Sequence, residues 1–399
     1  MTTTATPTTD PADFLAIWDQ LDEGERQVGE AVRRFVTDRV LPEIGDWFEE
    51  GVFPRELIKE MGALGLLGMH LDGYGCAGTS AVAYGLACLE LEAGDSGFRS
   101  FVSVQGSLAM FPIRAYGSDE QKQRWLPGMA AGELIGCFGL TEPDSGSDPA
   151  AMRTSARRDG TDWILNGTKM WITNGSMADV AVIWARDGDG QVRGFLVPTD
   201  TPGFQANAVR HKLSLRASVT SELVLDDVRL PQDAVLPGVR GMRGPLSCLN
   251  EARFGVLWGA AGAARACYLD ALDYAKTREQ FGQPIASYQL TQRKLVEMMV
   301  EVNRATLLAL HLGRVKDAGR LTMDQVSFGK FANVSGALDV ARTARSVLGA
   351  SGITAEYSPM RHAANLESVY TYEGTHEIHT LVLGAAITGH AAFRTAGAS

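Results

Sequence analysis

Hydrophobic residues recur three or four positions apart near the start of the chain, at Val28, Val32, Phe35, Val36 and Val40. This spacing predicts a helix with one apolar face, which Pro42 ends. Pro54 opens a second predicted helix, at a position where its missing N–H does no harm. Ser118 and Gln121 have the spacing of a capping box at the start of a third. The pattern therefore predicts a helical first domain.

The period of the pattern then changes to that of β-strands. Two β-rich runs flank Asn166-Gly167, a dipeptide typical of tight turns, and predict a β-hairpin. The runs Val180–Ala185 and Phe195–Val197 flank a DGDG turn and predict another strand pair. Glu222–Leu225 and Val228–Leu230 add further strand character.

Helical spacing returns in the last third, in a long stripe formed by Leu295, Met298, Met299, Val302, Thr306, Ala309 and Leu312. Further helices are predicted over roughly 321–348 and 375–393. The whole pattern predicts an α+β chain in four parts. These parts are a disordered tail (1–12), an N-terminal helical domain (13–134), a middle β-domain (135–240) and a C-terminal helical bundle (241–399).

The composition argues against several classes of protein. The 399 residues are 45% hydrophobic and 21% charged, as in ordinary globular proteins. Lys and Arg number 37 against 47 Asp and Glu, a net charge of −10 that argues against a nucleic-acid partner. No apolar run is long enough to span a membrane, and the threonine-rich start lacks the features of a targeting peptide, so we expect a cytoplasmic protein. Five scattered cysteines exclude a full disulfide framework.

Common catalytic motifs are absent: the sequence has no P-loop, no strand-bound G-x-G-x-x-G and no G-x-S-x-G. His376 and His379 lack the H-E-x-x-H spacing, so we predict no metal site. Trp171 beside Thr173 suits either a packed core or a flat heteroaromatic ligand. Taken alone, Glu373 is typical of an acidic residue near a helix N-terminus, here expected at Thr375.

Taken together in order, longer segments of the chain resemble the acyl-CoA dehydrogenase family, and most closely its glutaryl-CoA dehydrogenases. The resemblance runs from about residue 20 to about 395. It rests on GYGCAG, LELEAGDSGFRS, GCFGLTEPDSGSDP, LNGTKMWITN, LSLRAS, CLNEARFG, REQFGQPIASYQL, RHAANLES and TYEGTHEIH. It implies an N-terminal helical domain, a middle β-barrel or sandwich domain and a C-terminal four-helix bundle.

The resemblance also implies FAD as the cofactor, bound between the β-domain and the C-terminal bundle. The residues that would line the flavin within one chain are Phe138, Leu140, Thr141, Gly146, Ser147, Trp171, Ile172 and Thr173. A neighbouring subunit would add Arg278, Phe281 and Gln289 to the diphosphate and adenosine. Further positions that match FAD contacts are Ser346, Leu348, Gly349, Thr375 and Phe393.

For catalysis, the resemblance implies that Glu373 is the base that removes the α-proton of an acyl-CoA thioester. Burial beside the flavin would raise the pKa of this carboxyl group. Arg99 matches the arginine that would hold the distal carboxylate of glutaryl-CoA. The other residues implied at the substrate are Glu92, Ser100, Ser103, Ser147, Asn250, Arg253, Tyr372 and Gly374. Oxidation to glutaconyl-CoA and loss of CO2 would then yield crotonyl-CoA.

Family membership would imply a homotetramer that passes electrons to an electron-transferring flavoprotein. Alternatives remain open at this stage. The substrate could be a short- or branched-chain monocarboxylic acyl-CoA, the reaction could stop at glutaconyl-CoA, or oxygen could accept the electrons. A non-catalytic helical scaffold of the same fold is the alternative from a different class.

Overall fold

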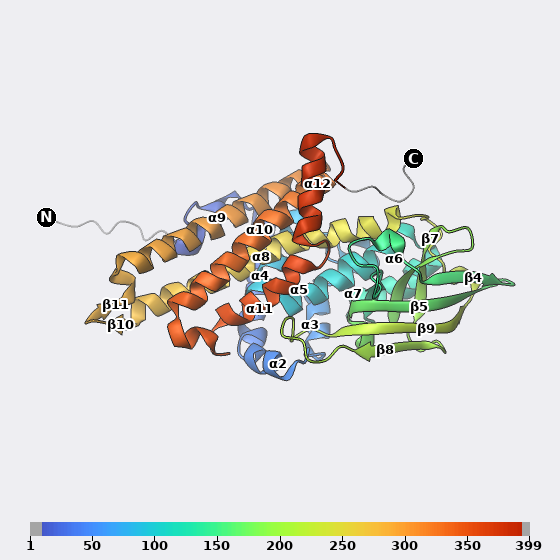
Figure 1. The fold of residues 1–399 in the computed structure, drawn as a ribbon, viewed down its shortest axis with the longest axis horizontal. Helices are drawn as coiled ribbons and strands as arrows, with labels where there is room; N and C mark the ends of the chain where they lie inside the picture. Colours follow the sequence, from blue (N-terminus) through green and yellow to red (C-terminus); the bar gives the residue numbers. More distant parts are fainter. Residues whose placement is uncertain (1–9, 393–399) are drawn as a thin grey trace.

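The computed structural model describes residues 10–392, and these form two helical regions on either side of a β-domain (Figure 1). This is the order predicted from the hydrophobic pattern. Asp10 caps a short 3-10 turn at Pro11–Asp13, which begins within the range expected as a tail and ends at the first residue of the expected N-terminal domain. Phe393 lies outside the described residues.

The N-terminal region is mainly helical. Its helices are α1 (Glu23–Phe35), α2 (Ile44–Glu50), α3 (Leu57–Ala63), α4 (Ala81–Gly94), α5 (Ser96–Ser103), α6 (Phe111–Tyr116) and α7 (Asp119–Ala130). The predicted apolar stripe continues from α1 into a π-helical turn at Val36–Val40, and Ser118 and Gln121 form the predicted capping box of α7. Helix α3 begins at Leu57, three residues later than Pro54 suggested. A short hairpin, β1 (Asp72–Gly73) with β2 (Cys76–Ala77), precedes α4.

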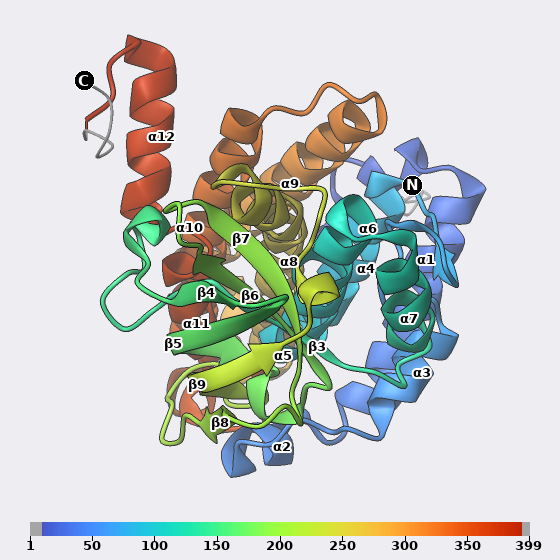
Figure 2. The ribbon, with the colours of Figure 1, turned by 90° about the vertical axis from the view of Figure 1, so that its right-hand side faces the viewer.

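The middle region is one curled sheet of seven strands (Figure 2). The strands are β3 (Gly136–Gly139), β4 (Ser155–Asp159), β5 (Asp162–Thr173), β6 (Val180–Arg186), β7 (Val192–Pro198), β8 (Phe204–Ala208) and β9 (Thr220–Leu230). Their order is β3-β6-β4-β5-β9-β8, and β7 pairs with β6 across the predicted DGDG turn.

The predicted hairpin at Asn166-Gly167 is wrong. Strand β5 runs straight through this dipeptide, and its pairing with β9 shifts register there, as at a β-bulge. Asp227 on β9 has a positive φ of 48°, and the Asn166 side chain both donates to its carboxylate and accepts its N–H. The Asn-Gly dipeptide therefore lies at a register shift between two long paired strands and does not form a turn.

The C-terminal region consists of α8 (Arg243–Thr277), α9 (Gln289–Asp317), α10 (Met323–Val347), α11 (Ser358–Thr371) and α12 (His376–Thr388). Helices α8 to α11 pack together as a bundle. Helix α12 ends at Gly389, earlier than predicted, because that glycine takes a left-handed C-cap conformation. A small hairpin, β10 (Glu279–Gln280) with β11 (Gln283–Pro284), extends the far end of the molecule from the β-domain (Figure 1).

Residues 10–392 show no membrane-spanning helix and no cluster of metal ligands. None of the helices there combines the length and apolar character needed to cross a membrane. No three His, Cys, Asp or Glu side chains in that range gather as metal ligands would. All five cysteines are free, and each except Cys76 is buried.

Helices α4 and α8 pack very closely in the helical core. A Cβ atom on Gly262 would overlap the carbonyl oxygen of Leu89, and one on Gly85 would overlap the ring of Trp258. Glycines on both helices therefore let the two backbones approach. This contact fixes where the buried side chains of α4 and α8 meet.

We predict that Gly262→Ala lowers the free energy of unfolding by about 1–3 kcal/mol, because the added methyl group has no space. Urea denaturation would measure the loss. Gly29→Ala on α1 is the matched control, since its Cβ would meet nothing nearer than the Cβ of Leu86, at 4.0 Å. Alanine there should leave stability unchanged or raise it by up to about 1 kcal/mol. Equal denaturation midpoints for Gly262→Ala and wild type would contradict the packing argument.

Candidate active site

Glu373 lies in a tight turn that joins α11 to α12. Its φ is 54° and that of Gly374 is 91°, so two consecutive residues adopt the left-handed region. A glutamate is rarely found there, and such conformations persist only where the surroundings hold them. Thr375 follows and caps α12 by accepting the N–H of Ile378, at 3.2 Å.

Two cationic side chains hold this turn by its carbonyl oxygens. Arg253 on α8 donates from Nε to the carbonyl of Glu373, at 2.6 Å. Lys330 on α10 donates from Nζ to the carbonyls of Tyr372 and Gly374, the latter at 2.6 Å. Arg253 also lies 3.5 Å from Oδ1 of Asn250, one turn away on α8.

The carboxyl group of Glu373 is turned inward. Its Oε2 atom is enclosed and has no hydrogen-bond partner among the described residues. Burial raises the pKa of this carboxyl group, and the cations Arg99, Lys330 and Arg253 oppose that rise in this order. A desolvated carboxylate with a free oxygen is suited to accept a proton from a bound molecule.

Arg99 lies in the same buried space, on α5. Its Nε donates to Oε2 of Glu92 at 2.5 Å, and its Nη2 donates to the hydroxyl of Tyr372. Both members of the ion pair have fully buried side chains. Burial disfavours the charged form of Arg99, but Glu92 and Tyr372 outweigh this and raise its pKa. Gly259 on α8 makes the space, because a Cβ there would overlap Oε2 of Glu92.

Donor groups remain free beside this ion pair. Within residues 10–392, Nη1 of Arg99 and the hydroxyl of Ser103 are buried without a hydrogen-bond partner. Ser103 lies one helical turn after Arg99 on α5, and Ser100, next to Arg99, is also buried. Buried polar groups are normally paired, so these two unpaired donors lack an acceptor that a bound molecule could supply.

A second set of predicted residues surrounds the loop after β3. Phe138 and Leu140 are buried, Thr141 is half-buried, and Gly146 and Ser147 are exposed. The carbonyl of Thr141 accepts the N–H of Met170, at 2.8 Å, which brings the loop beside the end of β5.

Trp171 and its neighbours complete this surface at the end of β5. The side chain of Trp171 is 60% exposed and its φ is 65°. Ile172 is buried and Thr173 half-buried. The interpretation of Trp171 as a core residue is therefore wrong: the ring is presented outward next to a hydroxyl.

A buried ion pair that was not among the predicted residues supports this loop. Lys169 donates to Oε1 of Glu142 at 2.8 Å and to the carbonyl of Leu140 at 3.0 Å. Glu142 also accepts the N–H groups of Arg153 and Thr154. Burial lowers the pKa of Lys169 to about 8.

Lys330 was also not among the predicted residues, although a sequence signal exists. It lies four positions after Val326 and four before Val334, on the apolar face of α10. A lysine on such a face needs partners, because a buried charge without them is costly.

The remaining predicted residues lie elsewhere. Arg278, Phe281 and Gln289 are exposed on and beside the β10–β11 hairpin, Phe281 to 95%, at the far end from the β-domain (Figure 1). The C-terminal end of α10 carries Ser346, Leu348 and Gly349. Lys294, near the start of α9, donates to the hydroxyl of Ser346 at 3.0 Å. One chain therefore does not bring this group to Trp171.

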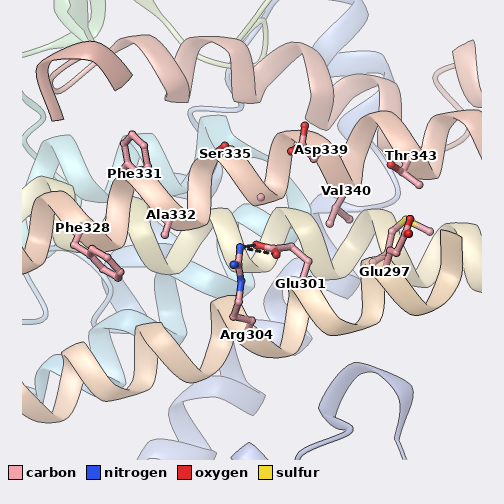
Figure 3. A pocket seen from close by; sticks show the side chains of 12 residues that line it. Glu297, Glu301, Arg304, Phe328, Phe331, Ala332, Ser335, Asp339, Val340 and Thr343 are labelled. Atoms are coloured by element: carbon pink, nitrogen blue, oxygen red, sulfur yellow. Dashed lines mark hydrogen bonds and ion pairs between the residues drawn. The ribbon is translucent and has the colours of Figure 1, made fainter. Parts of the chain in front are cut away.

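The outer face of α9 and α10 carries a groove (Figure 3). Phe328, Phe331 and Val340 of α10 supply its apolar walls. Glu301 and Arg304 of α9 form an ion pair across its floor, at 2.6 Å. Phe331 also stacks on His376 at the start of α12, with ring centroids 4.0 Å apart.

Comparison with known domain families gives three consecutive matches. The N-terminal domain of acyl-CoA dehydrogenases matches residues 22–133, the middle domain residues 137–228 and the C-terminal domain residues 239–388. These matches confirm both the resemblance and the predicted fold class.

The individual relatives carry two different enzyme names, glutaryl-CoA dehydrogenase and short-chain specific acyl-CoA dehydrogenase. Two solved structures of glutaryl-CoA dehydrogenase from Mycobacterium smegmatis are similar to the chain. One, in complex with FADH2, is 63% identical with a TM-score of 0.96, covering 97% of this chain and 100% of that one. The other is 66% identical with a TM-score of 0.94, covering 96% and 99%. The mitochondrial short-chain specific acyl-CoA dehydrogenase of Homo sapiens is 36% identical to this chain. The match covers 93% of this chain and 90% of the human protein.

We predict that Glu92→Gln destabilises the protein by about 3–5 kcal/mol, because it leaves the buried Arg99 without a counter-charge. Adding Arg99→Met should recover much of the loss, since the unpaired charge is then removed. Urea denaturation of both variants would measure this.

Glu60→Gln is the control for this prediction, because Glu60 pairs with Arg39 in an exposed position at 2.8 Å. It should cost at most about 1 kcal/mol. If Glu92→Gln were as mild as Glu60→Gln, or the double variant were worse than the single one, the ion pair would not matter as argued.

Proposed function

This chain belongs to the acyl-CoA dehydrogenase family, and we propose that it oxidises glutaryl-CoA with FAD and decarboxylates the product to crotonyl-CoA. Membership of the family makes it an oxidoreductase. The glutaryl substrate and the decarboxylation are the finer part of the proposal, and the name of the human short-chain relative points to a different acyl group.

One observation carries the choice of substrate: Arg99 is a buried cation with a free donor near the candidate base. Its Nη1 and the hydroxyl of Ser103 have no partner in the described residues. A carboxylate at the far end of the acyl chain would accept both hydrogen bonds, in addition to the ion pair that Arg99 makes with Glu92. An alkyl chain would leave both donors unpaired, which is expensive in a dry pocket.

Glu373 supplies the proton chemistry. Its carboxylate takes the proton from Cα of the thioester, and the hydrogen on Cβ leaves with its electron pair, so that a Cα–Cβ double bond forms. A raised pKa makes the carboxylate a better base and also lets it hold the proton for the next step. The cations Arg99, Arg253 and Lys330 keep part of the anionic form available.

The surface around Trp171 fits the flavin. An exposed flat ring, the hydroxyl of Thr173 and the polar loop after β3 offer stacking and hydrogen bonds to a heteroaromatic group. The residues that would hold it within one chain are Phe138, Leu140, Thr141, Gly146, Ser147, Trp171, Ile172, Thr173 and Thr375. Bound FAD supplies the acceptor for the hydride.

Decarboxylation follows from the same arrangement. In glutaconyl-CoA the bond from Cγ to the carboxylate can break, because its electron pair delocalises into the conjugated thioester. CO2 then leaves, and the protonated Glu373 returns its proton to Cγ, which gives crotonyl-CoA. Arg99 would have to release the carboxylate charge as this bond breaks.

A second copy of the chain would complete the flavin site. Arg278, Phe281, Gln289, Ser346, Leu348 and Gly349 lie together but far from Trp171, so they suit a neighbour's cofactor. The groove between α9 and α10, lined by apolar and charged side chains alike, offers a surface for such contacts. We infer a homotetramer on this basis and on the family resemblance, with an electron-transferring flavoprotein as the electron acceptor.

We predict that Glu373→Gln keeps the fold and the yellow flavin but loses turnover. Glutamine is almost the same size and cannot accept the α-proton. A general base typically contributes about 10²–10⁴-fold, and the loss should be at least this large. Anaerobic flavin bleaching on addition of glutaryl-CoA measures the step directly. Bleaching at the wild-type rate would place the base elsewhere.

We predict that Arg99→Met lowers kcat/KM for glutaryl-CoA by about 10²–10³-fold while sparing butyryl-CoA. The reason is that a buried carboxylate without its cation loses about 3–5 kcal/mol. Steady-state assays of both acyl-CoAs with a dye acceptor give the preference ratio. Arg265→Met is the control, because it also removes a buried guanidinium, one that pairs with Glu90 at 2.5 Å outside the proposed site.

Three outcomes would alter the proposal. An unchanged preference ratio in Arg99→Met would mean that another residue recognises the carboxylate. A wild-type preference for butyryl-CoA would favour a short-chain dehydrogenase. Product masses of glutaconyl-CoA instead of crotonyl-CoA in the anaerobic reaction would remove the decarboxylation step.

A further inference from the structure

We propose that Lys330 is a positioning residue for the reaction: by holding the carbonyl oxygens on both sides of Glu373, its ammonium group fixes the turn that carries the base. The inference rests on the proposed role of Glu373. It adds a residue on α10 that makes no contact with substrate or flavin in the mechanism above.

The partners of Lys330 are unusual for a buried lysine. The residue is only 2% exposed, and within residues 10–392 no carboxylate lies close enough to form an ion pair with it. Its two hydrogen bonds go instead to the carbonyls of Tyr372 and Gly374. A lysine whose only task was to fill space could be replaced by an apolar residue at no loss, so these bonds are the reason to bury it.

The hydrogen bonds from Lys330 and Arg253 are centred on Glu373. Three consecutive carbonyl oxygens accept hydrogen bonds from cationic side chains, the outer two from the buried Lys330 and the middle one from the half-buried Arg253. Two consecutive left-handed residues turn the backbone in this segment. Removing the outer contacts frees the turn on both sides of Glu373, and catalysis is sensitive to misplacement of a base by about 1 Å.

Charge couples the two groups as well. Glu373 is faced by Arg99 from α5, Glu92 from α4, Arg253 from α8, Lys330 from α10 and Tyr372 from its own turn. Lys330 is faced by Glu373, Arg253 and Arg99. Burial lowers the pKa of Lys330 to about 7, while burial raises that of Glu373.

Helix α12 adds two histidines near Lys330. Burial lowers the pKa of His379 to about 3, so this imidazole is neutral at working pH. Burial also lowers the pKa of His376. Neither replaces the positive charge of Lys330.

The sign of the pH effect follows. A nearby cation stabilises the carboxylate of Glu373, so loss of Lys330 should raise the pKa of the base. Activity needs the unprotonated base. The acid limb of the kcat/KM profile, which reports the free enzyme, should therefore move to higher pH.

The test compares Lys330→Met with Lys212→Met in the FAD-loaded enzyme, using glutaryl-CoA and a dye acceptor. Lys212 is a matched control, because its ammonium also donates to backbone carbonyls, those of Leu215 and Ser218, in a loop with left-handed residues. Burial lowers its pKa to about 8. It has no place in the proposed mechanism.

For Lys330→Met we expect kcat to fall by about 10-fold or more and the acid limb to move up by about one pH unit. Lys212→Met should lower thermal stability, but its kcat and the acid limb of its kcat/KM profile should match those of the wild type. Lys330→Gln, whose amide can still donate to a carbonyl, should lose less kcat but show the same shift of the acid limb.

A drop in kcat with an unmoved acid limb in both Lys330 variants would reduce Lys330 to a structural role, and unchanged kcat would overturn the proposal outright. If Lys330→Met loses flavin or fails to fold, Lys330→Gln alone decides between these outcomes. Glu373→Gln is assayed in parallel. If that variant remains active, the proposed base is wrong, and the failure lies there and not with Lys330.

Discussion

The ionisable groups around Glu373 are largely removed from water, and their formal charges do not cancel. Arg99, Arg253 and Lys330 carry three positive charges, against two negative charges on Glu92 and Glu373, so the sum is 3 − 2 = +1. An excess charge in a region of low dielectric is costly. A ligand with one carboxylate would balance it. The opposing pKa shifts of Glu373 and Lys330 express the same constraint, because both groups respond to burial by becoming less charged.

The fold meets this constraint by building most of the site on long, rigid helices. Helix α8 supplies Arg253 and also Gly259, whose missing side chain leaves room for Glu92. The glycine contacts between α4 and α8 let the two helices approach closely, so Glu92 lies directly against the backbone of Gly259. Of these five charged groups, Glu373 alone lies outside the helices, and its turn accepts hydrogen bonds from α8 and α10 through its carbonyl groups.

Much of this could be predicted from the sequence, but the reasons differ between parts. Helices and strands followed from the spacing of apolar residues, because burial of one face is a local property of the chain. The Asn166-Gly167 turn failed because pairing of β5 with β9, far away in sequence, outweighs a dipeptide preference. Glu373 and Arg99 came from resemblance, and their burial was consistent with it. Lys330 and Lys169 could not be predicted in the same way, since their partners are backbone carbonyls or acidic groups brought close only by folding.

The separation of the two groups of residues proposed to bind FAD would give the protein a thermodynamic property that no single chain could have. On the proposed assembly, each cofactor is bound partly by one subunit and partly by the next. Association of subunits and retention of FAD then become one linked equilibrium, in which each strengthens the other by the same free energy. Dilution would release cofactor, and loss of cofactor would loosen the assembly. The concentration of the protein itself would thus set how much of it is ready to work.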